Sequence, residues 1–303
     1  MHLMEGRSLA GIGFFVLATL LFGIMDTLIK YLSADYGTWQ IMFFRAAFSL
    51  LPIGILIART GGLISLRTKS VTAHAARSLM GVAAAYGFFY SFGVMPLADV
   101  YAIGFAAPLF MTALSVPVLK EKVGWRRWLA VLVGFGGVMV MMRPGQGVFS
   151  LLALIPLGAA FFYALSMLFV RALSRTESNG AITFYFVTTL GLVSGVCMIP
   201  GFRIPDAEGL LLLALVGIVG GVAQIVFTQA FRLAAPSLLA PFEYVAMIWA
   251  AGFGYLFFAE VPDTAIWTGC AIVAASGLYI IHRETVLHRR AAMATGADGE
   301  TIR

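Results

Sequence analysis

Long apolar runs, separated by short polar segments, follow one another along almost the whole chain. Most are about as long as an α-helix that crosses the hydrocarbon core of a bilayer, which takes roughly 20 residues. The pattern therefore predicts an all-α integral membrane protein with ten transmembrane helices. We expect these helices near Leu9–Leu32, Trp39–Ala58, Ala75–Val94, Leu97–Leu119, Trp128–Met142, Phe149–Leu173, Ala181–Ile199, Leu210–Phe231, Ser237–Ala259 and Thr264–Ile281.

The second half of the chain repeats features of the first half in the same order. Lys30 and Arg171 each end an apolar run and are followed by one residue and then Leu-Ser, while Glu121 and Glu260 each precede a tryptophan and a small-residue-rich run. The order predicts two five-helix repeats, at residues 9–142 and 149–282. Because five is an odd number, the two repeats are expected to have opposite orientations in the membrane.

The positions of Lys and Arg predict the orientation of the helices, since cytoplasmic loops carry more of both. If the amino terminus is cytoplasmic, only Lys30, Arg143 and Arg203 fall outside; Arg45 lies within a span, and all the others fall inside. Both termini are therefore expected to be cytoplasmic. The polar segment 283–303 is expected to form a disordered cytoplasmic tail.

The composition excludes a water-soluble globular protein. Hydrophobic residues make up 61% of the chain and charged residues 11%, against about 45–50% and about 25% in soluble domains. The net charge of +6 does not indicate a nucleic-acid partner, because the basic residues sit in short loops and form no basic face. Cys197 and Cys270 lie in apolar runs and provide no disulfide or metal framework.

Charged side chains inside the predicted spans are candidates for a site, because a charge near mid-helix costs about 2.5–3.5 kcal/mol on insertion scales. Asp26 and Arg45 lie at similar depths in the first two spans and could form an ion pair. Either the pair, or Arg45 alone, holds a polar or anionic part of a substrate, or the pair only locks two helices together. The second repeat has Phe186 where the first has Arg45, so we expect an asymmetric site.

Polar residues in the second half supply a further set of candidates. Gln224 and Gln229 are five residues apart on one span, so they point to different sides of a helix with about 3.6 residues per turn. Gln224 is the better candidate to face a cavity, at a depth close to that of Glu243. These side chains either offer hydrogen bonds to a heteroaromatic ring or join helices to one another, and Glu243 could also carry a coupled proton.

Tyrosines in the expected cavity helices could stack on a planar ligand or simply pack between helices. Tyr86 and Tyr90 share a helix face because they are four residues apart. The others fall in different spans: Tyr101, Tyr163, Tyr185 and Tyr244.

A family resemblance rests on Leu21-Phe22-Gly23, on Phe44-Arg45, on the stretch from Ala107-Pro108-Leu109-Phe110 through Glu121 into the Gly-rich fifth span, and on Glu260 through Gly277. In these segments the chain resembles the drug/metabolite transporter superfamily, and within it the proteins built from two EamA domains, over about residues 9–282. The resemblance implies a central cavity lined by spans one to four and six to nine, with spans five and ten peripheral.

The segments 97–108 and 239–244 resemble those of a bacterial subgroup that includes riboflavin and S-adenosylmethionine importers. The resemblance implies a multi-pass protein of the bacterial inner membrane that moves a small metabolite by alternating access. Riboflavin uptake is the first expectation. S-adenosylmethionine, an amino acid or another metabolite is the alternative.

An integral membrane enzyme is the alternative from a different class. The sequence has no H-E-x-x-H, G-x-S-x-G or P-loop motif, so we expect neither an enzyme nor ATP-driven transport, and no cofactor. The expected partners are a small-molecule substrate and the lipid bilayer. The G-x-x-x-G spacings at Gly191–Gly195 and Gly217–Gly221 favour close packing within the bundle, with a homodimer as an open alternative.

Overall fold

The computed structural model describes residues 2–59, 62, 66–68, 70–119, 124–142, 149–174, 176–234, 239, 242–280 and 282. All regular secondary structure in these ranges is helical. The expected tail at 283–303 lies outside the described residues, as do Glu121 and Arg143.

The helices of the first half are α1 (His2–Leu32), α2 (Thr38–Arg59), α3 (Val71–Val94), α4 (Leu97–Gly104), α5 (Ala107–Leu119) and α6 (Trp125–Met142). Those of the second half are α7 (Phe149–Leu152), α8 (Leu154–Leu173), α9 (Asn179–Cys197), the short 3₁₀ helix Ile199–Gly201, α10 (Ala207–Leu233) and α12 (Val245–Phe258), and a further apolar helix covers Thr264–Ile280.

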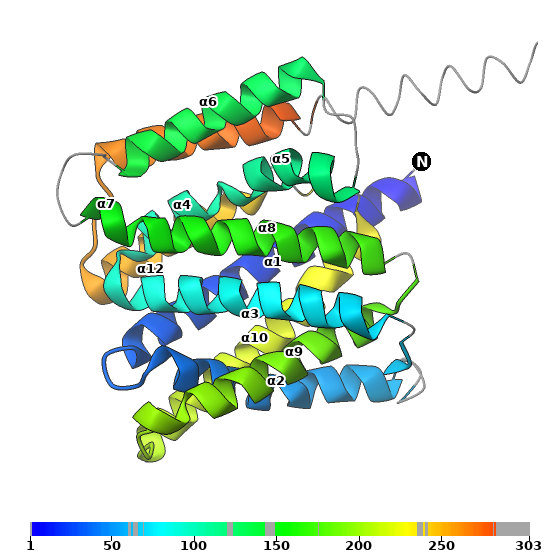
Figure 1. Ribbon diagram of the computed structural model, residues 1–303, viewed down its shortest axis with the longest axis vertical. Coiled ribbons are helices and arrows are strands. Elements are labelled where there is room, and N and C mark those ends of the chain that lie inside the picture. Colours follow the sequence, from blue (N-terminus) through cyan, green and yellow to red (C-terminus); the bar gives the residue numbers. More distant parts are fainter. Residues whose placement is uncertain are drawn as a thin grey trace, which may run out of the picture.

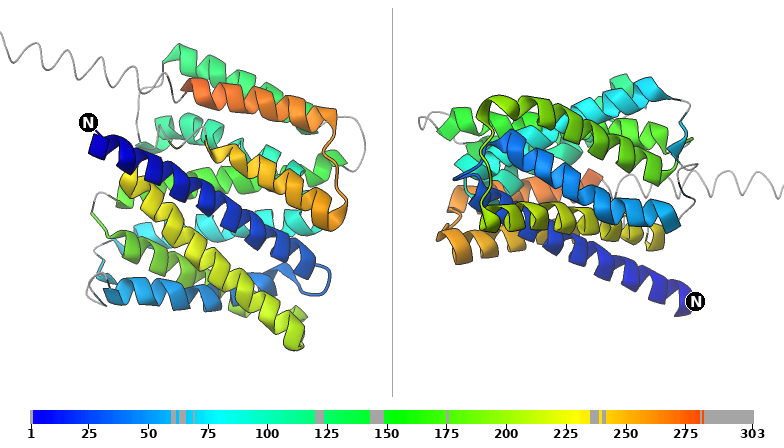
Figure 2. Two further views of the ribbon diagram at one scale, coloured as in Figure 1. Left: turned by 180° about the vertical axis from the view of Figure 1, so that it is seen from behind. Right: turned by 90° about the horizontal axis from the view of Figure 1, so that it is seen from below.

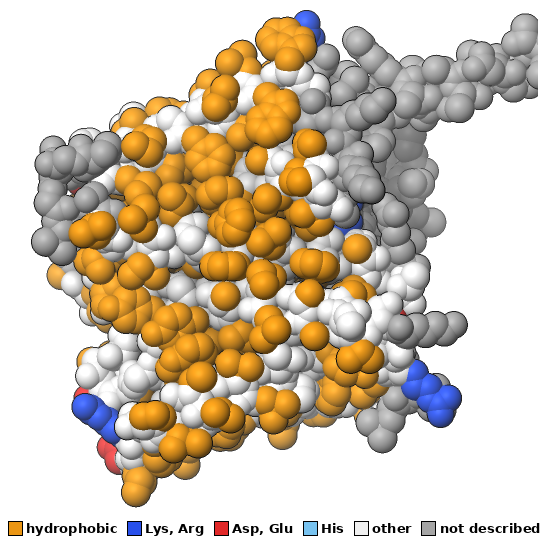
Figure 3. All heavy atoms as spheres, viewed as in Figure 1, with side chains coloured by type: hydrophobic (Ala, Val, Ile, Leu, Met, Phe, Trp, Pro, Cys, Tyr) orange, Lys and Arg blue, Asp and Glu red, His pale blue; other side chains and the backbone are white. Residues whose placement is uncertain are grey.

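The described residues include six helical stretches long and apolar enough to cross a membrane, and three shorter apolar helices. Large apolar side chains cover the face shown in Figure 3, and the Lys and Arg side chains visible there lie at its edges. Leu132, Leu192 and Leu256 are each about two-thirds exposed or more. Exposed apolar surface on this scale fits contact with lipid and does not fit contact with water.

One expected span, Leu97–Leu119, is divided into two helices. α4 ends at Gly104, residues Phe105 and Ala106 form a turn, and α5 begins at Ala107. Pro108 has no N–H with which to bond the carbonyl of Gly104, so the ladder of α4 cannot continue through this point. The helix is therefore interrupted partway along its length, as in the discontinuous helices of many transporters.

The packing of the helices follows the internal repeat. α1 packs along α10, and α3 packs along α8, which is the same pairing with the two repeats exchanged. α2 packs against α9, its own counterpart in the second repeat. α6 and the helix Thr264–Ile280 lie side by side at one edge of the bundle (Figures 1 and 2), where the Ser276 hydroxyl donates to the Ala130 carbonyl.

Glycines allow α10 to pack closely against α2. A Cβ atom at Gly217 would overlap Phe48, and one at Gly221 would overlap Pro52. The second spacing, Gly191–Gly195, also faces α2. Both G-x-x-x-G segments thus bring helices of the two halves together within this chain.

Candidate functional site

A cavity of about 490 Å³ lies between the two halves of the bundle, a volume in the usual range for small-molecule sites. Apolar and aromatic side chains form most of its wall. Six of the residues predicted from the sequence line it: Asp26, Arg45, Tyr101, Tyr163, Gln224 and Glu243. These residues are far apart in the sequence and come from both halves of the chain.

Asp26 and Arg45 both line the cavity, but the ion pair that the sequence allowed between them is not formed. The Tyr101 hydroxyl instead donates to Asp26 Oδ2 at 2.5 Å. The Arg45 guanidinium lies 5.4 Å from the centre of the Phe89 ring, and its Nε is 3.5 Å from Met25 Sδ. Electrostatic attraction still links the Asp26 and Arg45 side chains. α4 and α1 touch where the Tyr101 hydroxyl meets the Asp26 carboxylate.

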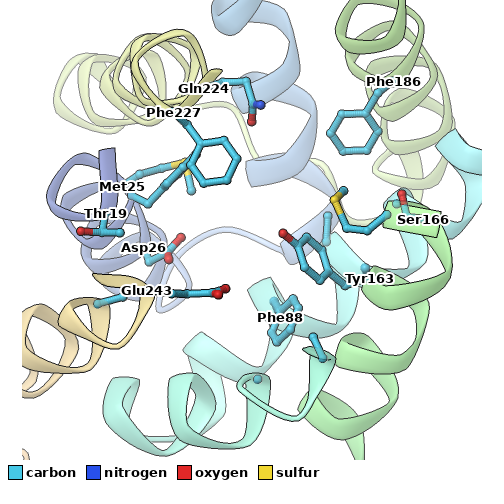
Figure 4. Close-up of a pocket in the computed structure, with 18 of the residues that line it drawn as sticks. Thr19, Met25, Asp26, Phe88, Tyr163, Ser166, Phe186, Gln224, Phe227 and Glu243 are labelled. Carbon is cyan, nitrogen blue, oxygen red and sulfur yellow. The ribbon is translucent and has the colours of Figure 1, made fainter. Parts of the chain in front are cut away.

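Gln224, Tyr163 and Glu243 approach the cavity from different sides (Figure 4). The Gln224 side chain points into the space from α10, and Tyr163 reaches across from α8 toward the side that holds Asp26 and Glu243. Glu243 is exposed to the cavity, and its charge acts on the Tyr163 hydroxyl. The wall therefore offers an amide, a phenol and carboxylates around one apolar space.

Five predicted residues lie outside the cavity lining: Tyr86, Tyr90, Tyr185, Gln229 and Tyr244. The Tyr185 hydroxyl donates to the Leu66 carbonyl at 3.1 Å. Tyr86 is stacked on Trp39 at 4.3 Å and also packs against Tyr90 at 6.2 Å. Tyr244 meets the Phe105 ring edge-on at 5.0 Å. These tyrosines pack between helices. Gln229 is turned away from the lining because its five-residue separation from Gln224 rotates it around α10.

Arg77 lines the cavity, whereas the sequence analysis counted it only among the basic residues on the cytoplasmic side. The structure starts α3 at Val71, so Arg77 lies in its second turn, where it is 8% exposed and lines the cavity. Its guanidinium carbon lies 4.0 Å from the centre of the Phe186 ring. The sequence predicted that this helix begins at Ala75. The observed start at Val71 adds one turn before Ala75 and so places Arg77 deeper in the helix.

At one end of the bundle lies an ion pair, Lys30 with Glu260, that the sequence did not predict. Lys30 Nζ lies 2.7 Å from Glu260 Oε1 and donates to the Phe92 and Met95 carbonyls at 3.1 and 2.6 Å. Glu260 Oε2 accepts from the Leu97 backbone N–H at 3.0 Å. This network, called the Lys30–Glu260 latch below, ties the ends of α1, α3 and α12 to the start of α4.

An all-helical bundle with a lipid-compatible surface and a part-polar cavity between its halves defines a multi-pass membrane protein built to hold a small molecule. Comparison with known families places it more narrowly. Residues 9–143 and 150–282 each match the EamA-like transporter family, and the chain belongs to this family. It is a multi-pass protein of the inner membrane, and its family and relatives are named as transporters and not as enzymes.

Several curated relatives cover nearly the whole chain. A riboflavin transporter of Vibrio cholerae is 29% identical over 95% of this chain and 98% of the relative. The pseudopaline exporter CntI of Pseudomonas aeruginosa is 30% identical over 90% of this chain and 93% of the relative. An S-adenosylmethionine uptake transporter of Rickettsia prowazekii is 28% identical over 91% of this chain and 94% of the relative.

The fold also resembles that of a solved crystal structure, with a TM-score of 0.61 over 95% of this chain and 99% of the other. The two sequences are 15% identical, so the likeness concerns the fold alone.

Proposed function

We propose that this protein is a secondary transporter that carries a small metabolite across the inner membrane by alternating access. The observation that supports this most directly is a central cavity combined with a closed network at one end of the bundle. A carrier of this kind exposes a site near the bilayer midplane to one side at a time.

The cavity extends away from the Lys30–Glu260 latch. Its lining includes Phe15 in the first half of α1, Val170 near the end of α8 and Phe231 near the end of α10. These positions lie toward the opposite end of the bundle from the latch. With ten spans in two inverted repeats and both termini cytoplasmic, the latch closes the outer side and the cavity reaches toward the cytoplasm.

The internal repeat also provides sequence counterparts of the two latch residues. Arg171 and Glu121 occupy the sequence positions in the repeats that correspond to Lys30 and Glu260. In an inverted repeat, equivalent residues lie at opposite sides of the membrane. In this proposal, these two sequence positions belong to the cytoplasmic side.

Riboflavin and S-adenosylmethionine are the two substrate candidates. Riboflavin is favoured by the relatives of that name, by the aromatic wall and by Gln224, whose amide can pair with the polar edge of a flavin ring. S-adenosylmethionine is favoured by other relatives and by the charged side chains of the cavity. The relatives include both uptake transporters and an exporter by name, so their names do not decide the direction of transport.

Uptake into proteoliposomes tests the proposal. The purified full-length protein is reconstituted without ATP, and entry of radiolabelled riboflavin and S-adenosylmethionine is followed in parallel against protein-free liposomes. Saturable uptake of one compound, inhibited by the same compound unlabelled, is the expected result. If neither compound enters, and neither raises the melting temperature of the purified protein, both substrate assignments fail.

A further inference from the structure

The Arg77 guanidinium is buried beside the cavity, and two of its nitrogen atoms have no hydrogen-bond acceptor among the described residues. Its Nε and Nη1 atoms have no partner among the described residues, although the side chain is only 8% exposed. The Arg77 backbone is held firmly, since its carbonyl accepts from the Ser166 hydroxyl at 3.0 Å. The structure thus positions the residue while leaving its charged group unsatisfied.

Structural needs do not explain this arrangement. A buried N–H without an acceptor carries the cost of its lost hydration, and the cost is greater for a charged group. The Phe186 ring offers a cation–π contact to the face of the guanidinium but no acceptor in the plane of its N–H groups. A methionine or leucine could fill the same space against Phe186 without that cost. Such a group needs an explanation, and the position of Arg77 in the cavity lining offers one, a ligand group that completes its hydrogen bonds.

The opposite wall of the cavity carries negative charge. Asp26 and Glu243 lie on one side of the space, and Tyr163, Phe186 and Ser166 lie on the other (Figure 4). Arg77 belongs to the second side because it stacks on Phe186, and its charge and that of Glu243 both act on the Tyr163 hydroxyl. A molecule between the two walls therefore meets the Arg77 guanidinium on one side. On the other it meets the Glu243 carboxylate and Asp26, whose charge is partly offset by Arg45.

We propose that Arg77 is the specificity-determining anchor of the cavity, and that it binds the carboxylate of an amphoteric metabolite whose cationic group faces Glu243. The proposal rests on the transport function above and goes beyond it by naming the substrate class. An arginine fork matches the two oxygens of a carboxylate in a bidentate pair. A neutral flavin offers Arg77 no charged partner. A phosphate dianion would meet repulsion from Glu243, the lining carboxylate without a basic residue among the influences on its charge.

Two pairs of compounds that differ in one group test the ligand. Decarboxylated S-adenosylmethionine lacks only the carboxylate of S-adenosylmethionine, and flavin mononucleotide adds only a phosphate to riboflavin. In the wild-type protein we expect protection from heat by S-adenosylmethionine, with affinity at least about tenfold weaker for the decarboxylated form. In Arg77→Gln we expect the two to bind equally weakly, whereas Arg77→Lys retains part of the preference.

The matched control is Arg126→Gln, which removes the same charge from an exposed position on α6 and should leave the preference unchanged. Equal binding of the carboxylated and decarboxylated compounds by the wild-type protein would overturn the proposal, as would tighter binding of flavin mononucleotide than of riboflavin. Uptake of riboflavin without uptake of S-adenosylmethionine by the wild-type protein would overturn it while leaving the transport function intact.

A second measurement needs no ligand. If Arg77 serves binding, the ligand-free Arg77→Met variant should melt at the same temperature as the wild-type protein or higher, because an unsatisfied buried charge is gone. If Arg77 is needed for packing or folding, the variant should melt at a lower temperature, and that result rejects the anchor role. If neither S-adenosylmethionine nor any of the twenty amino acids raises the melting temperature of the wild-type protein, the proposal that Arg77 binds a carboxylate is rejected.

Discussion

The Lys30 ammonium lies 2.7 Å from the Glu260 carboxylate and joins the end of the first helix to a residue of the second repeat just beyond α12. The two side chains are 12% and 18% exposed, so the pair is largely sheltered from water. It lies at the end of the bundle opposite to the one toward which the cavity extends, and in the proposed transport cycle this end must open.

We expect Glu260→Gln to favour the state that is open at the latch. Removing one partner of a fully buried ion pair destabilises a protein by roughly 3–5 kcal/mol. Because this pair is partly exposed, we expect a smaller loss of stability for the state in which the latch is formed. A cysteine at the cavity position Phe88 should then react faster with a membrane-impermeant reagent added outside. The matched control is Glu208→Gln, an exposed carboxylate outside the latch. The double variant Lys30→Glu with Glu260→Lys restores an ion pair and should slow the labelling reaction again. Unchanged labelling of the cysteine in Glu260→Gln would contradict a role of the latch in opening this end.

The bond between Tyr101 and Asp26 should contribute to stability. Tyr101→Phe removes only the hydroxyl that donates to Asp26 at 2.5 Å, and hydrogen bonds to charged groups are worth about 1.5–3 kcal/mol. We expect a lower melting temperature in detergent, and less loss from Tyr101→Phe when Asp26→Asn is already present. Additive effects of the two changes would show that the bond carries no coupling energy.

Gln224 and Gln229 form a matched pair on one helix. Gln224 points into the cavity, whereas Gln229 lies outside the lining. Gln224→Leu should weaken uptake of the transported compound about fivefold, the effect of losing one hydrogen bond of about 1 kcal/mol. Gln229→Leu should leave the uptake affinity near that of the wild-type protein. Equal losses in the two variants would speak against a substrate contact at Gln224.

Close approach of α10 and α2 should make Gly217 sensitive to a single methyl group. A Cβ atom there overlaps Phe48 and the backbone of α2, while a Cβ atom at Gly158 on α8 meets nothing within 4 Å. Both Gly→Ala changes raise helix propensity equally, so their difference isolates packing. We expect Gly217→Ala to destabilise the protein by about 1–3 kcal/mol and Gly158→Ala to be neutral or stabilising. A thermal unfolding comparison in the same detergent decides between these outcomes.

The orientation of the chain can be tested with two single cysteines. In a background with Cys197→Ser and Cys270→Ala, Ile204→Cys should react with an impermeant reagent in intact cells, because the positive-inside pattern places this exposed loop outside. Gly124→Cys should react only after permeabilisation. The reverse pattern would invert the assignment of the termini and of the latch.

The sequence alone could determine the helical, membrane-embedded character of the chain, its internal repeat and its family, because these depend on local composition and on the order of motifs. It also singled out Asp26, Arg45 and Gln224 as polar groups in apolar runs, since charge and polarity at membrane depth stand out in any single sequence. Apolar periodicity could not tell which tyrosines face the cavity, because both faces of a membrane helix are apolar.

Tertiary structure decided the partners of these residues. Asp26 bonds to Tyr101 and not to Arg45, Arg77 turns into the cavity, and Lys30 meets a carboxylate far along the chain. Each of these depends on how a helix is rotated and how closely it approaches its neighbours. The rotation and the distance are set by packing between small residues such as Gly217 and the opposite helix. This packing brings together segments that are far apart in the sequence, so their contact cannot be predicted from the local sequence pattern.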